Sequence, residues 1–260
     1  MRIAVCIKQV PDTTEVRMDP VKGTLVREGV AAIVNPFDTY AVEEAVRLKE
    51  RHGGAVAVVT MGPPQAEAAL RDCLAVGADE AWLVSDRAFA GSDTWATGLT
   101  LSAALRKIGF DLLICGKQAI DGDTAQVGPG LAVHLNLPQA TYVRKIREVR
   151  DGRMVVERLL EEGTEVMELP LPGLLTVVKE INEPRLPSLK GKMRAKKCEI
   201  RKLTAADLGL PAAELGLDGS PTKVMRIFAP PPRGGGQVFK GEPPEVAEQL
   251  IAALAKDRVL

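Results

Sequence analysis

The feature that most constrains this chain is a series of short apolar runs that alternate with stretches of helical periodicity. The runs are apolar at nearly every position, and they cover residues 3–10, 55–61, 81–85 and 111–116. Such runs suit strands that are covered on both faces, as in a parallel sheet. Helices are predicted between them, at residues 39–51, 64–76, 92–107 and 124–135. The alternation predicts a doubly wound, mostly parallel, Rossmann-like α/β sheet with right-handed crossovers.

Two segments interrupt the alternation. Residues 15–28 are predicted to form a hairpin, because Pro20 and Gly23 supply turn geometry. Residues 141–170 are predicted to form two or three antiparallel strands, with turns at Asp151-Gly152 and Glu162-Gly163. A buried strand follows at 174–178. The sheet is therefore expected to carry an antiparallel extension.

The last third of the chain has a different character. Residues 180–202 contain two prolines and many basic side chains, which indicates either a solvated surface segment or a docking segment. Residues 228–245 are too rich in proline and glycine for regular structure. An amphipathic helix is predicted at 245–256, begun by Pro243-Pro244. We therefore expect an α/β domain over 1–228, which includes the segment 182–200, and a C-terminal arm over 229–260.

Composition removes most conventional catalysts. The 34 basic residues balance 34 acidic ones, and only 3% of residues are aromatic, so nothing favours binding to nucleic acid. The four cysteines form no C-x-x-C pair and the two histidines lack motif partners, which leaves a metal site or a catalytic triad unsupported. We expect reduced, mostly buried thiols. With no signal peptide and no apolar run of ~20 residues, a cytoplasmic protein without membrane insertion is expected.

The most informative stretch is residues 111–141. A strand is predicted to end at Gly116, and a loop with Asp121, Gly122 and Asp123 should lead to a helix that Thr124 opens. Gly122 would let a ligand approach the backbone, and the helix start offers unpaired N–H groups, so the stretch favours a phosphate site. It lacks the Lys-Ser/Thr pair of a Walker A loop. The alternative is that Asp123 or Thr124 is simply a helix N-cap.

Other strand ends should lie beside this loop. The first strand ends at Ile7-Lys8-Gln9, and the strand at 55–61 ends before Gly62. Ligands of open α/β sheets bind outside the carboxyl ends of the strands, at the topological switch point. The segment Asn35-Pro36-Phe37-Asp38 would reach the same crevice, unless it is only an N-cap with proline in the turn.

Several segments resemble one family in order and spacing: CIKQVPDT (6–13), NPFDTYAVEEAVRLKE (35–50), TMGPPQAE (60–67), GKQAIDGDTAQVGP (116–129) and NEPRLPSLKGKMRAKK (182–197). Over essentially its whole length the chain resembles the β subunit of electron-transfer flavoproteins. Segments 8–13, 86–94 and 119–129 are most similar to the bifurcating, nitrogen-fixation-associated branch of this family. Phe37, in contrast, is also common in the branch whose β subunit binds AMP.

The resemblance implies a heterodimer with an α subunit that holds the electron-carrying FAD. It also implies a nucleotide in the β subunit, which is AMP in one branch and a second FAD in the other; we favour FAD. The implied nucleotide contacts are Cys6, Lys8, Asn35, Phe37, Asp38, Met61, Gly116, Gln118, Asp121, Gly122, Asp123, Thr124, Ala125, Gln126 and Val127. The phosphates would meet the backbone N–H groups of 123–127. Leu189 would anchor a partner dehydrogenase, and the tail after Ala229 would pack on the α subunit.

The function implied is that of an electron-carrier subunit, which helps to pass electrons from dehydrogenases or NADH to a quinone-linked oxidoreductase or a ferredoxin. Flavin would carry the redox chemistry, so no protein acid, base or nucleophile is needed, and whether the chain counts as an enzyme stays open. The alternative is an adenylating enzyme or an ATP-binding regulatory module on a similar scaffold. That alternative requires a pyrophosphate loop after the first strand, where KQVPDTTE contains no glycine.

Overall fold

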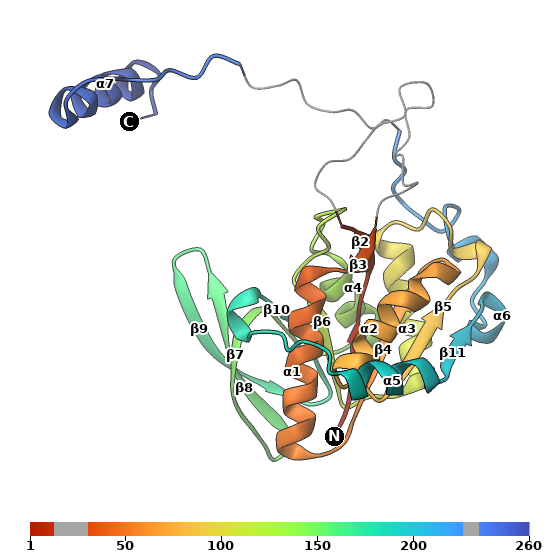
Figure 1. Ribbon diagram of the computed structural model, residues 1–260. Helices are drawn as coiled ribbons and strands as arrows, with labels where there is room; N and C mark the ends of the chain where they lie inside the picture. Colours follow the sequence, from red (N-terminus) through yellow and green to blue (C-terminus); the bar gives the residue numbers. More distant parts are fainter. Residues whose placement is uncertain (13–30, 226–233, 260) are drawn as a thin grey trace.

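The computed structural model describes residues 1–12, 31–225 and 234–259, and its centre is a nine-stranded sheet (Figure 1). The strand order is β11-β5-β4-β1-β6-β10-β7-β8-β9. The strands of this sheet are β1 (Arg2–Cys6), β4 (Ala55–Met61), β5 (Glu80–Val84), β6 (Leu112–Gly116), β7 (Gln139–Arg150), β8 (Arg153–Leu160), β9 (Gly163–Pro170), β10 (Gly173–Val177) and β11 (Ile200–Leu203). The α-helices are α1 (Pro36–His52), α2 (Glu67–Val76), α3 (Thr94–Ile108), α4 (Val127–Leu135), α5 (Leu189–Lys197), α6 (Ala205–Leu208) and α7 (Pro243–Lys256).

The strands from β11 to β7 pair in parallel, and the pairs β7–β8 and β8–β9 are antiparallel, so β8 runs against the other strands of this sheet. This arrangement confirms the predicted α/β class and its antiparallel extension. The turn between β7 and β8 falls at Asp151-Gly152, as predicted, and both residues have left-handed backbone conformations. The hairpin predicted for 15–28 lies outside the described residues. On either side of it, β2 (Gln9–Pro11) and β3 (Ala32–Val34) pair antiparallel.

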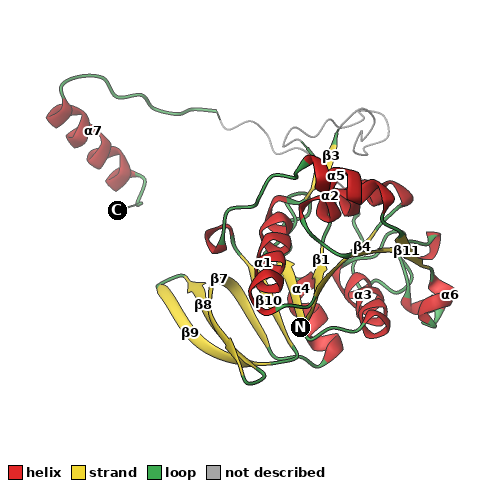
Figure 2. Ribbon diagram, turned by 60° about the horizontal axis from the view of Figure 1, so that its bottom comes forward, coloured by secondary structure: helices red, strands yellow, loops and turns green. Residues whose placement is uncertain are grey.

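Helices cover both faces of the parallel part, which explains why its strands are apolar at consecutive positions. Every residue of β6 and β10 is buried. One core layer packs under α1, α2 and α5, and a second packs under α3, α4 and α6. Figure 2 shows α2 and α5 on one side of β4 and β11, with α3 on the other. Burying each Leu or Ile side chain contributes about 1.5–3 kcal/mol, so the two layers supply most of the driving force for folding.

The alternation of strands and helices in the first two-thirds of the chain was predicted well. Residues 180–202, however, contain more regular secondary structure than expected. They form a short 3-10 turn at Lys179–Ile181, the helix α5, and the edge strand β11. The buried side chain Ala195 attaches α5 to the first core layer. The segment is therefore a folded part of the surface and not a bare solvated stretch.

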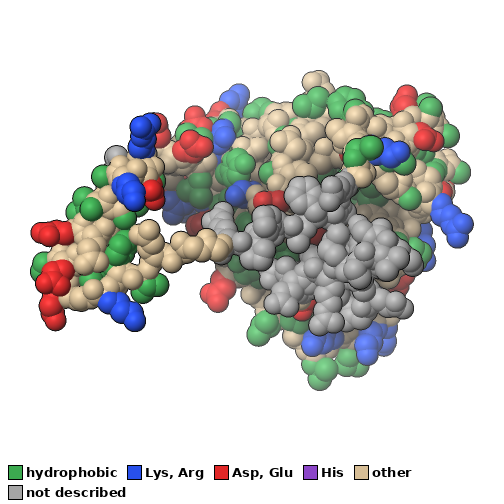
Figure 3. Space-filling view, turned by 90° about the horizontal axis from the view of Figure 1, so that it is seen from above, with side chains coloured by type: hydrophobic (Ala, Val, Ile, Leu, Met, Phe, Trp, Pro, Cys, Tyr) green, Lys and Arg blue, Asp and Glu red, His purple; other side chains and the backbone are tan. Residues whose placement is uncertain are grey.

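The predicted C-terminal helix is present as α7, and it lies apart from the α/β body (Figures 1 and 3). None of its residues is buried, although Leu250 and Ile251 are large and apolar. Of the helices that the structure describes, none combines the length and apolarity needed to span a bilayer. Three of the four cysteines, Cys6, Cys73 and Cys115, are buried, as predicted, and all four are free thiols.

Candidate functional site

The topological switch point lies between β1 and β6, because β1 pairs with β4 on one side and with β6 on the other. Cys6, Met61 and Gly116 are the last residues of β1, β4 and β6, so the three predicted contacts end neighbouring strands. The helix α1 begins at Pro36, directly above this edge, and therefore brings Phe37 and Asp38 to it. Parallel strands whose connections diverge in this way leave a crevice at their carboxyl ends.

Asn35 joins the two loops that border the crevice. It is fully buried, and its Nδ2 donates a hydrogen bond to the carbonyl of Gln118 over 2.8 Å. Its Oδ1 accepts from the backbone N–H of Ile120 (3.1 Å), and its own N–H donates to the carbonyl of Lys8 (2.8 Å). Asn35 occupies the N-cap position of α1, but its side chain does not cap the helix. The prediction that Asn35 is only an ordinary N-cap is therefore wrong, because its side-chain amide forms hydrogen bonds with the loop after β6 instead.

Asp38 lies buried beneath the crevice. Its Oδ2 accepts a hydrogen bond from the backbone N–H of Lys8 over 2.7 Å. Burial raises the pKa of Asp38 to about 7, although hydrogen bonds from Lys8, Asn35 and Gly116 act in the opposite direction. A carboxyl that is partly protonated at neutral pH adds less negative charge to the crevice than an ordinary aspartate would.

Gly116 is required at the end of β6 because α1 approaches it closely. A Cβ at this position would overlap Asp38 Oδ1 and lie 2.6 Å from the carbonyl carbon of Phe37. Real Cβ atoms essentially never approach neighbours so closely. The glycine therefore permits the start of α1 to sit on the switch point.

The loop after Gly116 differs from the prediction in one respect. Helix α4 begins at Val127 and not at Thr124, and its N-cap is Gln126, whose side chain makes no capping bond. Asp123 and Ala125 have left-handed backbone angles (φ 51° and 53°), which the helix interior excludes. The idea that Asp123 or Thr124 caps the helix is therefore also wrong.

The same loop is open on the side where a ligand would lie. An added Cβ at Gly122 would meet no atom within 4 Å, and residues 120–124 are exposed. Asp123 is held by its N–H, which donates to the carbonyl of Ala119 (2.8 Å), and by a bond from the side chain of Gln118. The first turn of α4, with N–H groups that lack partners inside the helix, follows directly.

A charge pair crosses the crevice. The Nζ of Lys8 lies 2.7 Å from Oδ1 and 2.8 Å from Oδ2 of Asp121, which joins the loop after β1 to the loop after β6. Because both side chains are solvent-accessible, the pair is worth at most about 1 kcal/mol. An anionic ligand could therefore draw Lys8 away from Asp121 at little cost.

One part of the site was missed from the sequence. The Nζ of Lys117 lies 5.9 Å from the ring centroid of Phe37 and 5.3 Å from that of Tyr142. These three residues, together with Arg158, line a cavity of about 620 Å³ beside the crevice. Lys117 follows Gly116 directly and could have been flagged. Tyr142 could not, because its position depends on the pairing of β7 with β10.

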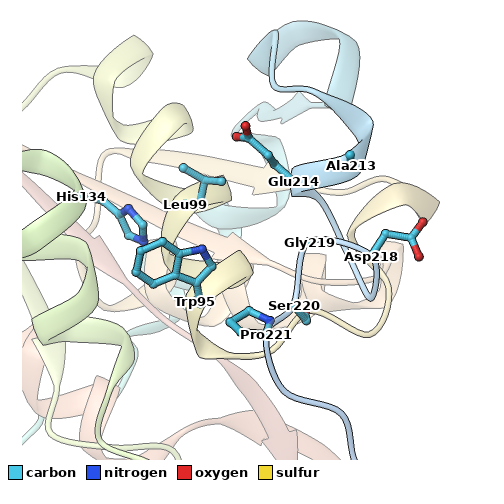
Figure 4. Close-up of a pocket in the computed structure, with 9 residues that line it drawn as sticks. All are labelled: Trp95, Leu99, His134, Ala213, Glu214, Asp218, Gly219, Ser220 and Pro221. Atoms are coloured by element: carbon cyan, nitrogen blue, oxygen red, sulfur yellow. The ribbon is translucent and has the colours of Figure 1, made fainter.

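A larger cavity, of about 780 Å³, lies over the outer side of α3 and α4 (Figure 4). Its wall includes Trp95, whose ring meets His134 edge-on with centroids 4.7 Å apart, and the segment from Ala213 to Pro221. None of the predicted nucleotide contacts lines it. We therefore place the candidate site at the switch point and not in this larger cavity.

Leu189 stands apart from the nucleotide contacts. It is the first residue of α5, and its side chain is 77% exposed. Ser188 caps the helix by accepting a hydrogen bond from the N–H of Gly191 over 3.0 Å. Leu189 is therefore a surface residue held on a helix, and not a core residue.

Comparison with known proteins gives a consistent result. The model of the electron transfer flavoprotein domain family matches residues 22–208. A β subunit of electron transfer flavoprotein from Thermoanaerobacterium thermosaccharolyticum is 53% identical, over 100% of both chains. The subunit CarD of the caffeyl-CoA reductase-Etf complex of Acetobacterium woodii is 50% identical, again over 100% of both chains. Protein FixA of Azotobacter vinelandii is 49% identical, over 98% of this chain and 94% of the relative.

Proposed function

The chain belongs to the β subunits of the electron transfer flavoproteins, and from that premise we propose that its switch-point crevice binds an adenine nucleotide. The observation that carries the proposal is the convergence of the loops after β1 and β6 on one edge, joined by the buried Asn35. Residues 123–127, with an exposed loop and the first turn of α4, would supply N–H groups to the phosphates. Lys8 would add positive charge.

The proposed nucleotide is a second FAD, with AMP as the other candidate. The relatives include the CarD subunit of a caffeyl-CoA reductase-Etf complex and several FixA proteins, which supports placing the chain in the bifurcating branch. The cavity at Phe37, Lys117 and Tyr142 opens beside the crevice and offers aromatic and cationic groups to the part of FAD that AMP lacks. When bound, the flavin would supply the redox chemistry, and the protein would position it.

We propose that residues 229–260 form an arm that packs on an α subunit. The helix α7 supports this, because it is amphipathic, has no buried residue, and lies away from the body (Figure 1). An apolar stripe that the chain itself leaves uncovered is typical of a helix that completes an interface with another chain.

We also propose that a partner dehydrogenase docks on the surface formed by Leu186, Leu189 and Met193, called here the docking surface. These side chains are 90%, 77% and 57% exposed. The helix α5 also carries four exposed lysines: Lys190, Lys192, Lys196 and Lys197. The partner that fits has an apolar pocket with carboxylates on its rim, because opposite charges would steer the encounter and the apolar side chains would hold it. The electrons would continue to a ferredoxin or a quinone-linked oxidoreductase.

The crevice proposal is tested by Gly122→Val in the complex of the two subunits. The valine side chain enters open space in the protein but occupies the ligand's approach, so affinity for added AMP and FAD should fall about ten-fold or more. Stability should stay near the parent's. Titration calorimetry on nucleotide-depleted complex measures the affinity, and Gly122→Ala, with one methyl group, should give an intermediate loss. Parent affinity in Gly122→Val would show that the nucleotide lies elsewhere.

A further inference from the structure

Arg185 holds the segment before the docking surface against α1 through two carboxylates. Its Nε lies 2.9 Å from Oε2 of Glu43, and its Nη1 lies 2.6 Å from Oε1 of Glu50. Its Nη2 reaches Oε1 of Glu43 (3.2 Å) and Oε2 of Glu50 (2.9 Å). The backbone N–H of Arg185 also donates to Glu43, over 3.2 Å. One guanidinium therefore binds two carboxylates that lie seven residues apart on the same helix.

The contact is stronger than an ordinary surface ion pair. Glu43 is only 3% exposed, so its attraction to Arg185 is less screened by water than that of an exposed pair. Burial acts to raise the pKa of Glu43, but hydrogen bonds from Arg185 and Arg47 outweigh it and hold that pKa below its usual value. Glu43 therefore stays charged at neutral pH, where both charges of its pair with Arg185 are present.

Neighbouring contacts fix the same segment. The Nδ2 of Asn182 donates to the carbonyl of Tyr40 (3.0 Å) and to Oε2 of Glu44 (3.1 Å), both on α1. Pro184 and Pro187 flank Arg185 and restrict the backbone on either side. Leu186, next to Arg185, is the most exposed side chain of the docking surface.

The helix that follows is held to a different element. Nη2 of Arg194 donates to the carbonyls of Leu74 (2.6 Å) and Ala78 (2.9 Å), at the end of α2. Nη1 of Arg71, on α2, donates in return to the carbonyl of Ala195 (2.7 Å). The docking surface is thus fixed by contacts with α1 on one side and with α2 on the other.

We propose that Arg185 is a positioning residue, which fixes the docking surface in its binding arrangement before the partner arrives. This inference rests on the proposed docking function. A segment already ordered in the free protein loses less conformational entropy on association, so the grip on Glu43 and Glu50 strengthens docking without touching the partner. Arg185 itself is directed at α1, and it acts on docking through Leu189.

The test uses the complex of the two subunits and a dehydrogenase selected because it reduces the parent complex. Arg185→Gln should raise the KM for that dehydrogenase about five- to ten-fold and leave kcat nearly unchanged. Hydrogen exchange at residues 186–193 should accelerate by a similar factor, without change in α3 or α4. Arg185→Lys keeps the charge but loses the two-pronged geometry, so it should rescue only part of the loss.

A double-mutant cycle separates positioning from a general structural effect. If Arg185 acts through Leu189, the double variant Arg185→Gln/Leu189→Ala should bind about as poorly as Leu189→Ala alone. The matched control is Arg147→Gln, which breaks another arginine–glutamate pair, that of Arg147 with Glu157 on β7 and β8 (2.7 Å), and should leave KM and exchange at the parent values.

The outcomes distinguish this inference from the docking proposal. Normal KM and exchange in Arg185→Gln, together with a raised KM in Leu189→Ala, would overturn the positioning role and leave the docking surface in place. Fully additive losses in the cycle would also overturn it. A parent KM in Leu189→Ala would instead refute the docking surface, and the inference with it. If Arg185→Gln does not fold, Glu50→Gln removes one of the two carboxylates that bind Arg185. This variant should give a smaller rise in the KM and in the hydrogen-exchange rate.

Discussion

At the scale of single residues, Asn35, Asp38 and Gly116 form the base of the crevice. Gly116 leaves room for the start of α1, and Asp38 receives the N–H of Lys8 in that position. Asn35 then connects the two loops above them. Asp38 also accepts hydrogen bonds from Asn35 and from the backbone of Gly116, so the base of the site is part of the buried core.

The raised pKa of Asp38 predicts a pH-dependent stability. The unfolded chain loses this proton near pH 3.8 and the folded chain only near pH 7, so folding becomes less favourable as pH rises between those values. The contribution that is present below pH 3.8 and lost above pH 7 is of order 4 kcal/mol. Asp38→Asn stays neutral, and its oxygen can still accept the N–H of Lys8.

We therefore expect the stability of Asp38→Asn relative to the parent to increase from pH 5 to pH 8. Urea denaturation of the purified complex at both pH values measures the difference. The sign of the trend is the test, because loss of the other hydrogen bonds shifts both values equally. A difference that does not increase from pH 5 to pH 8 would show that burial does not raise the pKa of Asp38.

The sequence allowed the crevice residues to be predicted, but not all of their roles. Asn35, Asp38 and Gly116 could be placed because they lie at strand and helix ends that a parallel sheet brings together. The amide of Asn35 was not predicted to serve the loop after β6, since its partners Gln118 and Ile120 are more than eighty residues away. Tyr142 was missed for the same reason, since its position depends on the pairing of β7 with β10, whereas Lys117 follows Gly116 directly and could have been found.

At the scale of elements, the predictions failed where local pattern and tertiary contacts disagree. Residues from 124 look like a helix start, but left-handed angles at Asp123 and Ala125 delay α4 to Val127. Residues 180–202 were predicted to be either a solvated surface segment or a docking segment, and most of this range folds into α5 and β11, which contradicts the first alternative. The reason is that Arg194 and Ala195 pack against α2 and its C-terminal end, which periodicity cannot show.

The contact between α5 and α2 leads to a prediction at Gly191. A Cβ there would overlap the carbonyl oxygen of Ala75 and approach Ser188 Oγ at 3.2 Å, so α5 must move away from α2. Gly191→Ala should therefore lower the free energy of unfolding by about 1–3 kcal/mol, although alanine favours helices. Denaturant unfolding of the complex measures the loss.

Gly130→Ala provides the control for this prediction. Gly130 lies in α4, and its added Cβ would meet no atom within 4 Å. The substitution should leave stability unchanged or raise it by up to about 1 kcal/mol, through helix propensity alone. A Gly191→Ala variant as stable as Gly130→Ala would mean that α5 does not pack as tightly on α2 as described.

At the scale of the whole molecule, the α/β body is complete in two core layers, while α7 stands outside it (Figures 1 and 2). The α/β class and the antiparallel extension could be predicted, because alternating apolar runs admit few topologies, whereas the order of the strands was not predicted. The position of α7 could not be predicted, because none of its residues is buried against the α/β body. The crevice, the docking surface and α7 lie on different parts of one chain, which suits a subunit that holds a nucleotide and meets several partners.

The function that we propose depends on an adenine nucleotide in the crevice of this subunit, and we expect that nucleotide to be FAD. The most direct measurement is the nucleotide content of the co-expressed complex with the α subunit, released by denaturation after incubation with excess FAD and separated by chromatography. Two FAD molecules per pair of subunits are expected. One FAD and one AMP per pair would contradict the second flavin, and one FAD with no second nucleotide would contradict the crevice itself.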